Sequence, residues 1–408
     1  MLDLIKNILK KNKKDPTINL QQQQKQKQHQ QSQSHQQQSK QSKVERRLRS
    51  HLEQDNKILS SNASSSHSLH SATTSSTKVT TSSSSSSLFN ASNVPQEFQS
   101  YYKELPFRYQ LIEQIGEGAF SVVFKALDTQ LNRLIAIKII DKTHLKTEQI
   151  NSVLKEIAIM SKLKHDNITR LYGHLNSSQS QYCFLYLEYV NGGELFNQII
   201  KYTYFSEDLS RHIIRQVTTS VKYLHDNGIV HRDIKPENLL FVKNDFIPRS
   251  NSEKFGARRQ SDDNNKVDEG AFIKNYGAGG IGAVKLADFG LSTVLYNDNM
   301  KAKTPCGTVG YTSPEQHLNL GYTKKVDIWA IGCVLYTLVV GFPPFYSNTQ
   351  DSKDISLKVA RGEYKFLAPW FDEVSDECKN LISNLLTVDP EKRYSVDQLL
   401  KDPWMLIV

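Results

Sequence analysis

The segment from Ile229 to Phe241 restricts the folds open to this chain more than any other part of the sequence. It reads Ile-Val-His-Arg-Asp-Ile-Lys-Pro-Glu-Asn-Leu-Leu-Phe, so a dense run of polar and charged residues lies between two apolar, strand-like pieces. Clustering so many polar side chains beside a core is costly, and proteins keep such clusters where a site uses them. We therefore expect a loop between two strands that carries a catalytic site.

A second polar site follows another apolar strand. Val284-Lys-Leu-Ala leads directly into Asp288, which stands beside Phe289-Gly290. Asp288 and Asn238 supply the hard oxygen atoms that Mg²⁺ prefers, together with phosphate oxygens and water. In the same site Asp233 would accept or orient the proton of a substrate hydroxyl. Lys235 would neutralise charge on a moving phosphoryl group.

A glycine turn separates two predicted strands earlier in the chain. Residues 109–115 read as one strand, and β-branched and aromatic residues continue as a second strand after the turn. In dinucleotide folds a comparable turn opens a helix, so this pattern favours a hairpin that covers phosphates. An ordinary hairpin is the alternative. The residues predicted to contact ATP here are Ile115, Gly116, Glu117, Gly118, Ala119, Phe120, Ser121, Val122 and Val123.

The next predicted strand, Leu134 to Ile140, places Lys138 among aliphatic residues. A buried ammonium group needs an anionic partner. Glu156, in the amphipathic run 153–160, is the candidate that would hold Lys138 against the α- and β-phosphates of ATP. The pair alone could be a structural salt bridge, but the glycine hairpin ahead of it favours phosphate binding.

Together these residues resemble the signature set of the eukaryotic protein kinases, over about Tyr109 to Met405. The matching residues are Gly116-x-Gly118, Lys138, Glu156, His231-Arg232-Asp233, Asn238 and Asp288-Phe289-Gly290. The resemblance implies an α+β fold of two lobes, a small β-rich N-lobe over about 109–190 and a larger, mainly α-helical C-lobe over about 191–405. It also implies transfer of the γ-phosphoryl group of ATP, with Mg²⁺, to protein substrates. Leu187 would be the gatekeeper, and Glu188 to Val190 the hinge that binds adenine.

Two departures from the family pattern remove no catalytic group: Ser121 stands at the position of a third glycine, and Ser313 replaces alanine before Pro-Glu. The alternative from another functional class is a catalytically silent pseudokinase scaffold. The presence of Lys138, Asp233 and Asp288 argues against it.

The catalytic-loop sequence around Lys235, with Gly307-Thr308 further on, resembles the serine/threonine branch of the family. Glu194 and Glu237 match positions that bind an arginine upstream of the phosphoacceptor in basophilic kinases, because a carboxylate pairs well with a guanidinium group. The alternative for Glu194 is an exposed carboxylate at a helix start.

Phe120-Ser121, Cys306-Gly307-Thr308 and Gly341 to Phe345 resemble the calcium/calmodulin-dependent kinase group. Within that group the chain is similar to fungal stress-responsive kinases activated by mitogen-activated protein (MAP) kinases. Thr304, followed by proline between Asp288 and Glu315, fits phosphorylation by such a proline-directed kinase. The added dianion would pair with Arg232 and order the loop. An inert loop threonine is the alternative. The sequence ends where the kinase fold ends, so it leaves the question of calmodulin open.

Two segments are predicted to be disordered. Residues 1–100 form a Gln/Ser-rich tail, in which runs such as Gln21 to Gln24 and Ser82 to Ser87 have almost no large apolar residues, and 243–283 form a polar, glycine-containing insertion. Burial in such segments cannot offset the entropy of ordering them. A role of the tail in protein interactions is a further hypothesis.

Charge and composition exclude other classes. The net charge is +9, but the Lys and Arg residues are scattered without an aromatic platform, which argues against nucleic acid as a partner. The longest apolar window, Ile328 to Phe342, is shorter than the roughly 20 residues of a membrane span and predicts a buried helix. Four cysteines without metal-type or disulfide-type spacing indicate a reducing compartment. We expect a cytoplasmic protein, with the nucleus as a second location.

Overall fold

The computed structural model describes residues 98–260, 262, 266–295, 302, 306–347 and 352–407. The disorder predicted for the tail therefore lies almost entirely outside the described residues. The described residues begin with Phe98 and helix α3 (Gln99–Tyr102), slightly before the predicted boundary at residue 100.

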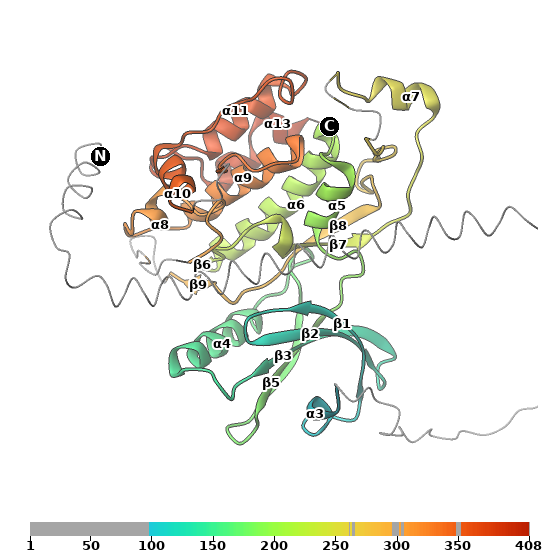
Figure 1. The fold of residues 1–408 in the computed structure, drawn as a ribbon, viewed down its shortest axis with the longest axis vertical. Helices are drawn as coiled ribbons and strands as arrows, with labels where there is room; N and C mark the ends of the chain where they lie inside the picture. The colour runs from blue at the N-terminus through green and yellow to red at the C-terminus, as the bar shows by residue number, and fades with distance from the viewer. Residues whose placement is uncertain are drawn as a thin grey trace, which may run out of the picture. The chain divides into compact units, whose positions relative to one another are not determined.

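A five-stranded antiparallel sheet forms the N-lobe (Figure 1), with the strand order β1-β2-β3-β5-β4. Its members are β1 (Tyr109–Glu117), β2 (Ser121–Asp128), β3 (Arg133–Asp141), β4 (Leu171–Asn176) and β5 (Tyr182–Glu188). Apolar side chains such as Phe124, Ile137 and Phe184 are buried on this sheet. Helix α4 (Thr147–Met160) lies between β3 and β4 in the chain, and its buried residues include Glu156 and Ile157.

A short N-terminal segment covers part of the N-lobe sheet. The Phe98 ring meets Phe124 edge-on, with 4.8 Å between the ring centroids. Tyr101 contacts the rings of Phe124 and Tyr182 at 5.7 and 5.3 Å. The Glu104 carboxylate accepts hydrogen bonds from the backbone N–H groups of Gln181 and Tyr182 at 3.0 and 3.2 Å. The folded unit therefore includes residues that precede the first strand.

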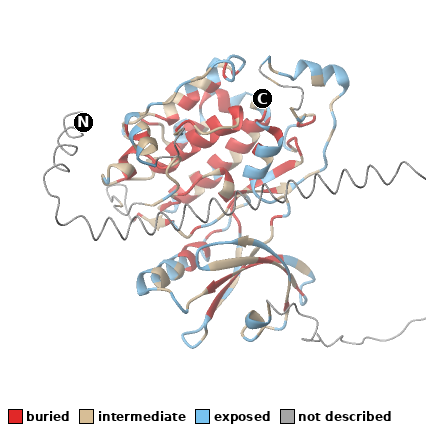
Figure 2. Cartoon of the chain, in the orientation of Figure 1, coloured by how far each residue is buried: buried red, intermediate tan, exposed pale blue. Residues whose placement is uncertain are grey.

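The C-lobe is built around helix α9 (Lys325–Val340), which is buried from Val326 to Val340. Figure 2 shows this buried helix beside α6 (Glu207–Asp226), which is also buried along much of its length. Because α9 is apolar on all sides, it can only be a core helix. The remaining helices are α5 (Leu195–Tyr202), α7 (Asn251–Gly256), α8 (Pro314–His317), α10 (Ser352–Arg361), α11 (Asp376–Leu385), α12 (Val396–Leu400) and α13 (Pro403–Leu406).

Two small antiparallel sheets lie at the edge of the C-lobe. Strand β6 (Ile229–Val230) pairs with β9 (Thr293–Val294), and β7 (Leu239–Lys243) pairs with β8 (Ile281–Leu286). They bring the two polar segments of the sequence, after β6 and after β8, to one place. The structure confirms the predicted two-lobed α+β fold.

The insertion differs from its prediction. The predicted disordered segment, 243–283, begins at the end of β7 and reaches into β8, and its described residues make ordered contacts with the C-lobe. Arg259 Nη1 donates to the carbonyl oxygen of Val339 at 2.8 Å, and Glu269 is only 4% exposed. Its polar composition suggested disorder because few residues can form a core. Here charged side chains and backbone groups of the insertion form hydrogen bonds with the C-lobe, which has its own apolar core.

No helix in the described part of the chain is long and apolar enough to cross a membrane.

The N-terminal segment generates a stability prediction. Tyr101→Ala removes two aromatic contacts and part of the cover over Phe124, so we expect the free energy of unfolding to fall by about 2 kcal/mol. Urea denaturation monitored by circular dichroism measures it. Phe107→Ala is the matched control, because Phe107 lies in the same segment and is 88% exposed. Equal midpoints for the two variants would contradict a packing role of Tyr101.

Candidate active site

The loop between β6 and β7 is held by one buried carboxylate from helix α9. Asp327, which is 0% exposed, accepts hydrogen bonds from the backbone N–H groups of His231 and Arg232 at 3.0 and 2.8 Å. The same carboxylate contacts His225 Nε2 at 2.9 Å. Burial alone would raise the pKa of Asp327, but the hydrogen bond and charge of His225 lower it below its ordinary value. Arg232 adopts φ +73°, a conformation that L-residues rarely take and that these two hydrogen bonds stabilise.

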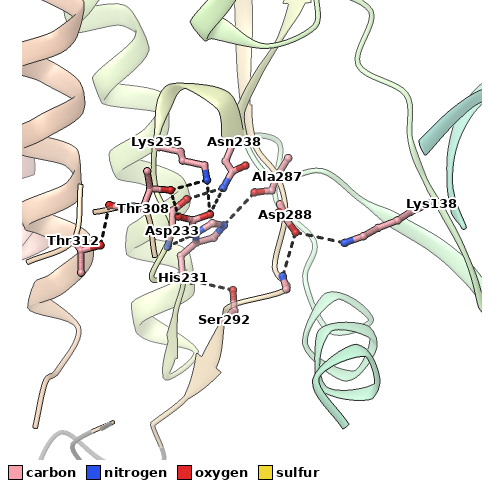
Figure 3. A network of polar contacts seen from close by, with 11 residues as sticks. Lys138, His231, Asp233, Lys235, Asn238, Ala287, Asp288, Ser292, Thr308 and Thr312 are labelled. Carbon is pink, nitrogen blue, oxygen red and sulfur yellow. Dashed lines mark hydrogen bonds and ion pairs between the residues drawn. The ribbon is translucent and has the colours of Figure 1, made fainter. Parts of the chain in front are cut away.

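Asp233 lies at the centre of a polar network (Figure 3). The Asn238 amide nitrogen donates to the Asp233 carbonyl and to Oδ2 at 2.8 and 2.9 Å. Lys235 Nζ lies 2.9 Å from Oδ2 of the same aspartate. Both carboxylate oxygens of Asp233 have partners, because the Thr308 hydroxyl donates to Oδ1. Because the Asn238 nitrogen points to Asp233, the oxygen of that amide is the atom that could bind a metal ion.

Thr308 is a site residue that the sequence pattern did not identify as such. Its hydroxyl donates to Asp233 Oδ1 at 3.1 Å and accepts from Lys235 Nζ at 2.8 Å. Gly307 makes this approach possible: it has φ +105°, and a Cβ there would lie 2.9 Å from the Arg232 carbonyl oxygen. The glycine was the available signal, because a residue without a side chain allows two backbones to come this close.

Asp288 meets a lysine from the N-lobe. Its backbone has φ +63°, and its Oδ1 lies 3.5 Å from Lys138 Nζ and accepts from the Gly290 N–H at 3.3 Å. The charge of Lys138 lowers the pKa of the Asp288 carboxyl. Phe289, the next residue, packs edge-on against His231 at 4.9 Å. The segment after β8 thus contacts both the loop after β6 and the N-lobe.

The ion pair predicted between Lys138 and Glu156 is present. Lys138 Nζ lies 2.7 Å from Glu156 Oε1, and the two side chains are 17% and 5% exposed. Burial alone would lower the pKa of Lys138, but the carboxylates of Asp288 and Glu156 raise it above its ordinary value. The ammonium group therefore stays charged, and two elements position it, strand β3 and helix α4.

The glycine turn is the predicted hairpin between β1 and β2. The Gly118 N–H donates to the Ser121 carbonyl at 2.7 Å, and a Cβ at Gly118 would lie 2.9 Å from Ser121 Oγ. The predicted ATP contacts of the hairpin, Ile115 to Val123, run from the end of β1 to the start of β2, and Glu117 to Phe120 are exposed at its tip.

The remaining predicted residues are placed as follows. Glu188 ends β5, and its carboxylate pairs with Lys285 Nζ at 3.0 Å, so a contact of Glu188 with adenine would have to come from its backbone. Val190, two residues on, is buried. Glu194 is exposed at the N-cap of α5. Glu237 is half-buried, and its Oε2 has no hydrogen-bond partner among the described residues. Burial raises the pKa of the Glu237 carboxyl.

Thr304 lies outside the described residues. The described residues on either side of it both contact Tyr322. Ala302 and Tyr322 exchange two backbone hydrogen bonds at 3.0 Å, and Cys306 Sγ lies 3.9 Å from the Tyr322 hydroxyl. That hydroxyl in turn accepts from Arg232 Nη1 at 2.7 Å.

Asp327 generates a prediction that concerns stability alone. In Asp327→Asn the amide nitrogen would face N–H donors that need an acceptor, so we expect a loss of about 3 kcal/mol in unfolding free energy. Thermal and urea unfolding measure the loss. The exposed Asp226, at the end of α6, provides the control Asp226→Asn, which should leave the midpoint nearly unchanged. A wild-type midpoint for Asp327→Asn would contradict the anchoring role.

Comparisons with known proteins agree with this geometry. The protein kinase domain model matches residues 109–405. The serine/threonine-protein kinase srk1 of Schizosaccharomyces pombe is 48% identical over 315 residues, which cover 74% of this chain and 52% of that protein. A calcium/calmodulin-dependent protein kinase type II of the same yeast is 48% identical, over 73% of this chain and 57% of that protein. The serine/threonine-protein kinase RCK2 of Saccharomyces cerevisiae is 44% identical, over 76% and 54%.

The chain thus spans about half the length of the curated relatives it matches. The match confirms the resemblance seen in the sequence, since it runs from the first strand of the N-lobe sheet to the last helix of the C-lobe. The chain belongs to the protein kinase family.

Proposed function

We propose that this chain transfers the γ-phosphoryl group of ATP to serine and threonine hydroxyls of proteins. One observation carries the proposal. The Asp233 carboxylate is oriented by Thr308, Lys235 and Asn238, in the same unit in which Lys138 is held by Glu156 beside Asp288. A silent scaffold would have no need to keep this arrangement.

Each residue has a chemical task in this proposal. Asp233 would accept a hydrogen bond from the substrate hydroxyl and orient its attack. Lys235 would offset negative charge on the moving phosphoryl group, and Lys138 would hold the α- and β-phosphates in place. Positioning and charge stabilisation account for most of the catalysis of phosphoryl transfer, and rigid side chains supply both.

The site also fits a magnesium ion. The Asp288 carboxylate is 53% exposed, and the Asn238 amide oxygen is the second hard donor. When bound, the ion would supply positive charge to the phosphate oxygens. The positive charge of Lys138 nearby lowers the pKa of Asp288, so the carboxylate stays ionised for this role.

Substrates with an upstream arginine are the proposed class. Glu194 is exposed at the start of α5, and α5 lies against the turn that carries Glu237. The Glu237 Oε2 atom is buried without a hydrogen-bond partner among the described residues. A carboxylate oxygen in this condition is stabilised by an incoming guanidinium group, which donates charge-assisted hydrogen bonds.

Regulation through Thr304 is supported by its neighbours and by the sequence. The contacts of Ala302 and Cys306 with Tyr322 hold both flanks of Thr304 near the hydroxyl that Arg232 contacts. Of the 12 prolines, two follow a serine or threonine, at Thr304 and Ser313. Ser313 is fully buried and bonded to Gln316, so Thr304 is the better target for a proline-directed kinase.

A second cation stands near this region. Lys155 Nζ on α4 contacts the Thr293 hydroxyl at 2.7 Å. Burial and, to a lesser extent, the charge of Arg232 lower the pKa of Lys155. A phosphate on Thr304 would relieve the repulsion between these two cations and connect α4 to the catalytic loop.

We infer an upstream MAP kinase, a stress-signalling role, and action in the cytoplasm and nucleus.

Asp233→Ala tests the proposed activity. Transfer of radiolabelled phosphate from ATP to a basic peptide should fall by at least about 100-fold, because the base that orients the hydroxyl is lost. The exposed Asp226→Ala should keep wild-type transfer. Equal transfer by wild type and Asp233→Ala would end the enzyme proposal, and absence of transfer by activated wild type would favour the scaffold.

Thr304→Ala tests the proposed regulation. Incubation with an active proline-directed kinase should raise wild-type activity about tenfold or more, through a new ion pair with Arg232, and should leave Thr304→Ala unchanged. Mass spectrometry should find the phosphate on Thr304 and not on Ser313. An inactive form of the upstream kinase is the control. Full activation of Thr304→Ala would show that the switch lies elsewhere.

A further inference from the structure

Tyr204 connects the α5–α6 turn to the insertion. Its hydroxyl donates to Asp262 Oδ1 at 2.5 Å. The Arg259 guanidinium carbon lies 3.9 Å from the centre of its ring, and Lys266 Nζ lies 4.0 Å from it. The tyrosine is only 8% exposed, so these contacts are made away from bulk water, where cation–π attraction is strongest. Three insertion residues therefore bind one side chain of the turn.

Glu269 of the insertion makes a second connection, to Ser206, which follows Tyr204 by two residues. Its Oε2 accepts from the Ser206 backbone N–H at 3.0 Å, and Ser206 is the N-cap of α6. Its Oε1 lies 3.5 Å from Arg249 Nη2. A carboxylate that is 4% exposed is costly to bury, and the Ser206 N–H and the charge of Arg249 offset part of that cost.

The last residue of α5 makes a third connection. The Tyr202 hydroxyl donates to the Gly279 carbonyl at 3.0 Å, and Tyr202 is 1% exposed. Gly279 has φ +65°, and a Cβ there would lie 3.0 Å from the Tyr202 ring. The Gly279 N–H donates to the Glu269 carbonyl at 2.6 Å, so the second and third connections belong to one backbone unit.

The insertion itself is anchored to the core of the C-lobe. Arg259 Nη1 donates to the Val339 carbonyl near the end of α9, and the Gln260 N–H donates to Glu373 Oε1 at 2.6 Å. The cation that contacts Tyr204 is therefore fixed to the most buried helix of the molecule. Contacts from the insertion can hold the turn in place only because the insertion is held in this way.

Helix α5 carries Glu194 at the end opposite to this turn. The helix has eight residues, so it is about 12 Å long and behaves as a short rigid rod. Near Glu194 the Gly192 N–H donates to the Phe241 carbonyl of β7 at 2.9 Å. Both ends of α5 thus contact the chain segment that contains the insertion, one end through β7 and the other through the insertion.

We propose that the described residues of the insertion between β7 and β8, 244–260, 262 and 266–280, are a brace that positions α5 and thereby sets the preference of the enzyme for substrates with an upstream arginine. The proposal rests on the proposed function, in which Glu194 binds that arginine. Tyr204, Arg259 and Glu269 are positioning residues in this scheme. They act on the substrate through α5, so their loss changes the selectivity between peptides more than the transfer of phosphate itself.

Tyr204→Ala is the principal test, made in the full chain. Two peptides are compared that differ only in an upstream arginine or alanine. We expect the ratio of kcat/KM between them to fall about five- to tenfold, through a higher KM for the arginine peptide, with kcat for both peptides close to wild type. Phe255→Ala is the matched control: it removes an aromatic ring from the same insertion, but Phe255 is 83% exposed and should leave the ratio unchanged.

Three further variants keep the test decisive if Tyr204→Ala folds poorly. Tyr204→Phe keeps the ring over which both cations lie and should retain most of the selectivity. Arg259→Ala removes a cation and the anchor to α9 and should reproduce the loss. In a Glu194→Ala background, Tyr204→Ala should produce no additional loss, because the residue that the brace positions is already absent.

Each outcome decides the question. A ratio that Tyr204→Ala and Arg259→Ala both leave intact overturns the brace while the proposed function stands. An equal loss of activity on both peptides, or an additive loss with Glu194→Ala, also overturns it, since either result indicates general destabilisation. A wild-type enzyme with no preference for arginine overturns the proposed substrate class, and the brace with it.

Discussion

The carboxylate of Asp327 organises the loop between β6 and β7 from inside the core. Helix α9 is apolar on all sides, and in its first turn it places one ionised group where two backbone N–H groups of the loop need an acceptor. These bonds hold Arg232 in a left-handed conformation immediately before Asp233. In an isolated loop no contact would offset the free-energy cost of that conformation. The geometry at Asp233 therefore depends on the packing of a helix nearly a hundred residues later in the sequence.

From this anchor the site extends through β-pairing and side-chain contact. Strand β8 pairs with β7, so the segment that carries Asp288 is fixed beside the loop that carries Asn238. Phe289 packs on His231, and Asp288 reaches Lys138, whose partner Glu156 lies on α4. Burial lowers the pKa of the His231 imidazole, which favours a neutral ring against Phe289. A shift in any one of these elements would separate charges that now stabilise one another.

Much of this arrangement could be predicted from the sequence, because for some residues the neighbouring sequence already indicates burial and the kind of partner that burial requires. Lys138 among aliphatic residues requires a carboxylate, and Glu156 is the acid within the amphipathic run 153–160. Ile328 to Phe342 is too apolar to be anything but buried. Thr308 could not be found in the same way, since a threonine beside a glycine is common and its role arises only when Gly307 brings two distant backbones together. The order of the insertion was missed for a related reason: composition reports whether a segment can form its own core, and says nothing of partners on another surface.

The insertion occupies a connection whose length has little cost for the fold. It lies between β7 and β8, whose pairing keeps its two ends adjacent, so lengthening the connection adds little to the cost of loop closure. Asp327, Asp233 and Asp288 are held by contacts with elements other than the insertion, so the geometry of the candidate site does not depend on this connection. Their anchors are carbonyl groups and charges at the ends of helices, where backbone groups lack intrahelical partners. A polar segment can therefore bind to the fold without disturbing its apolar core, and it does so at the helix that presents Glu194.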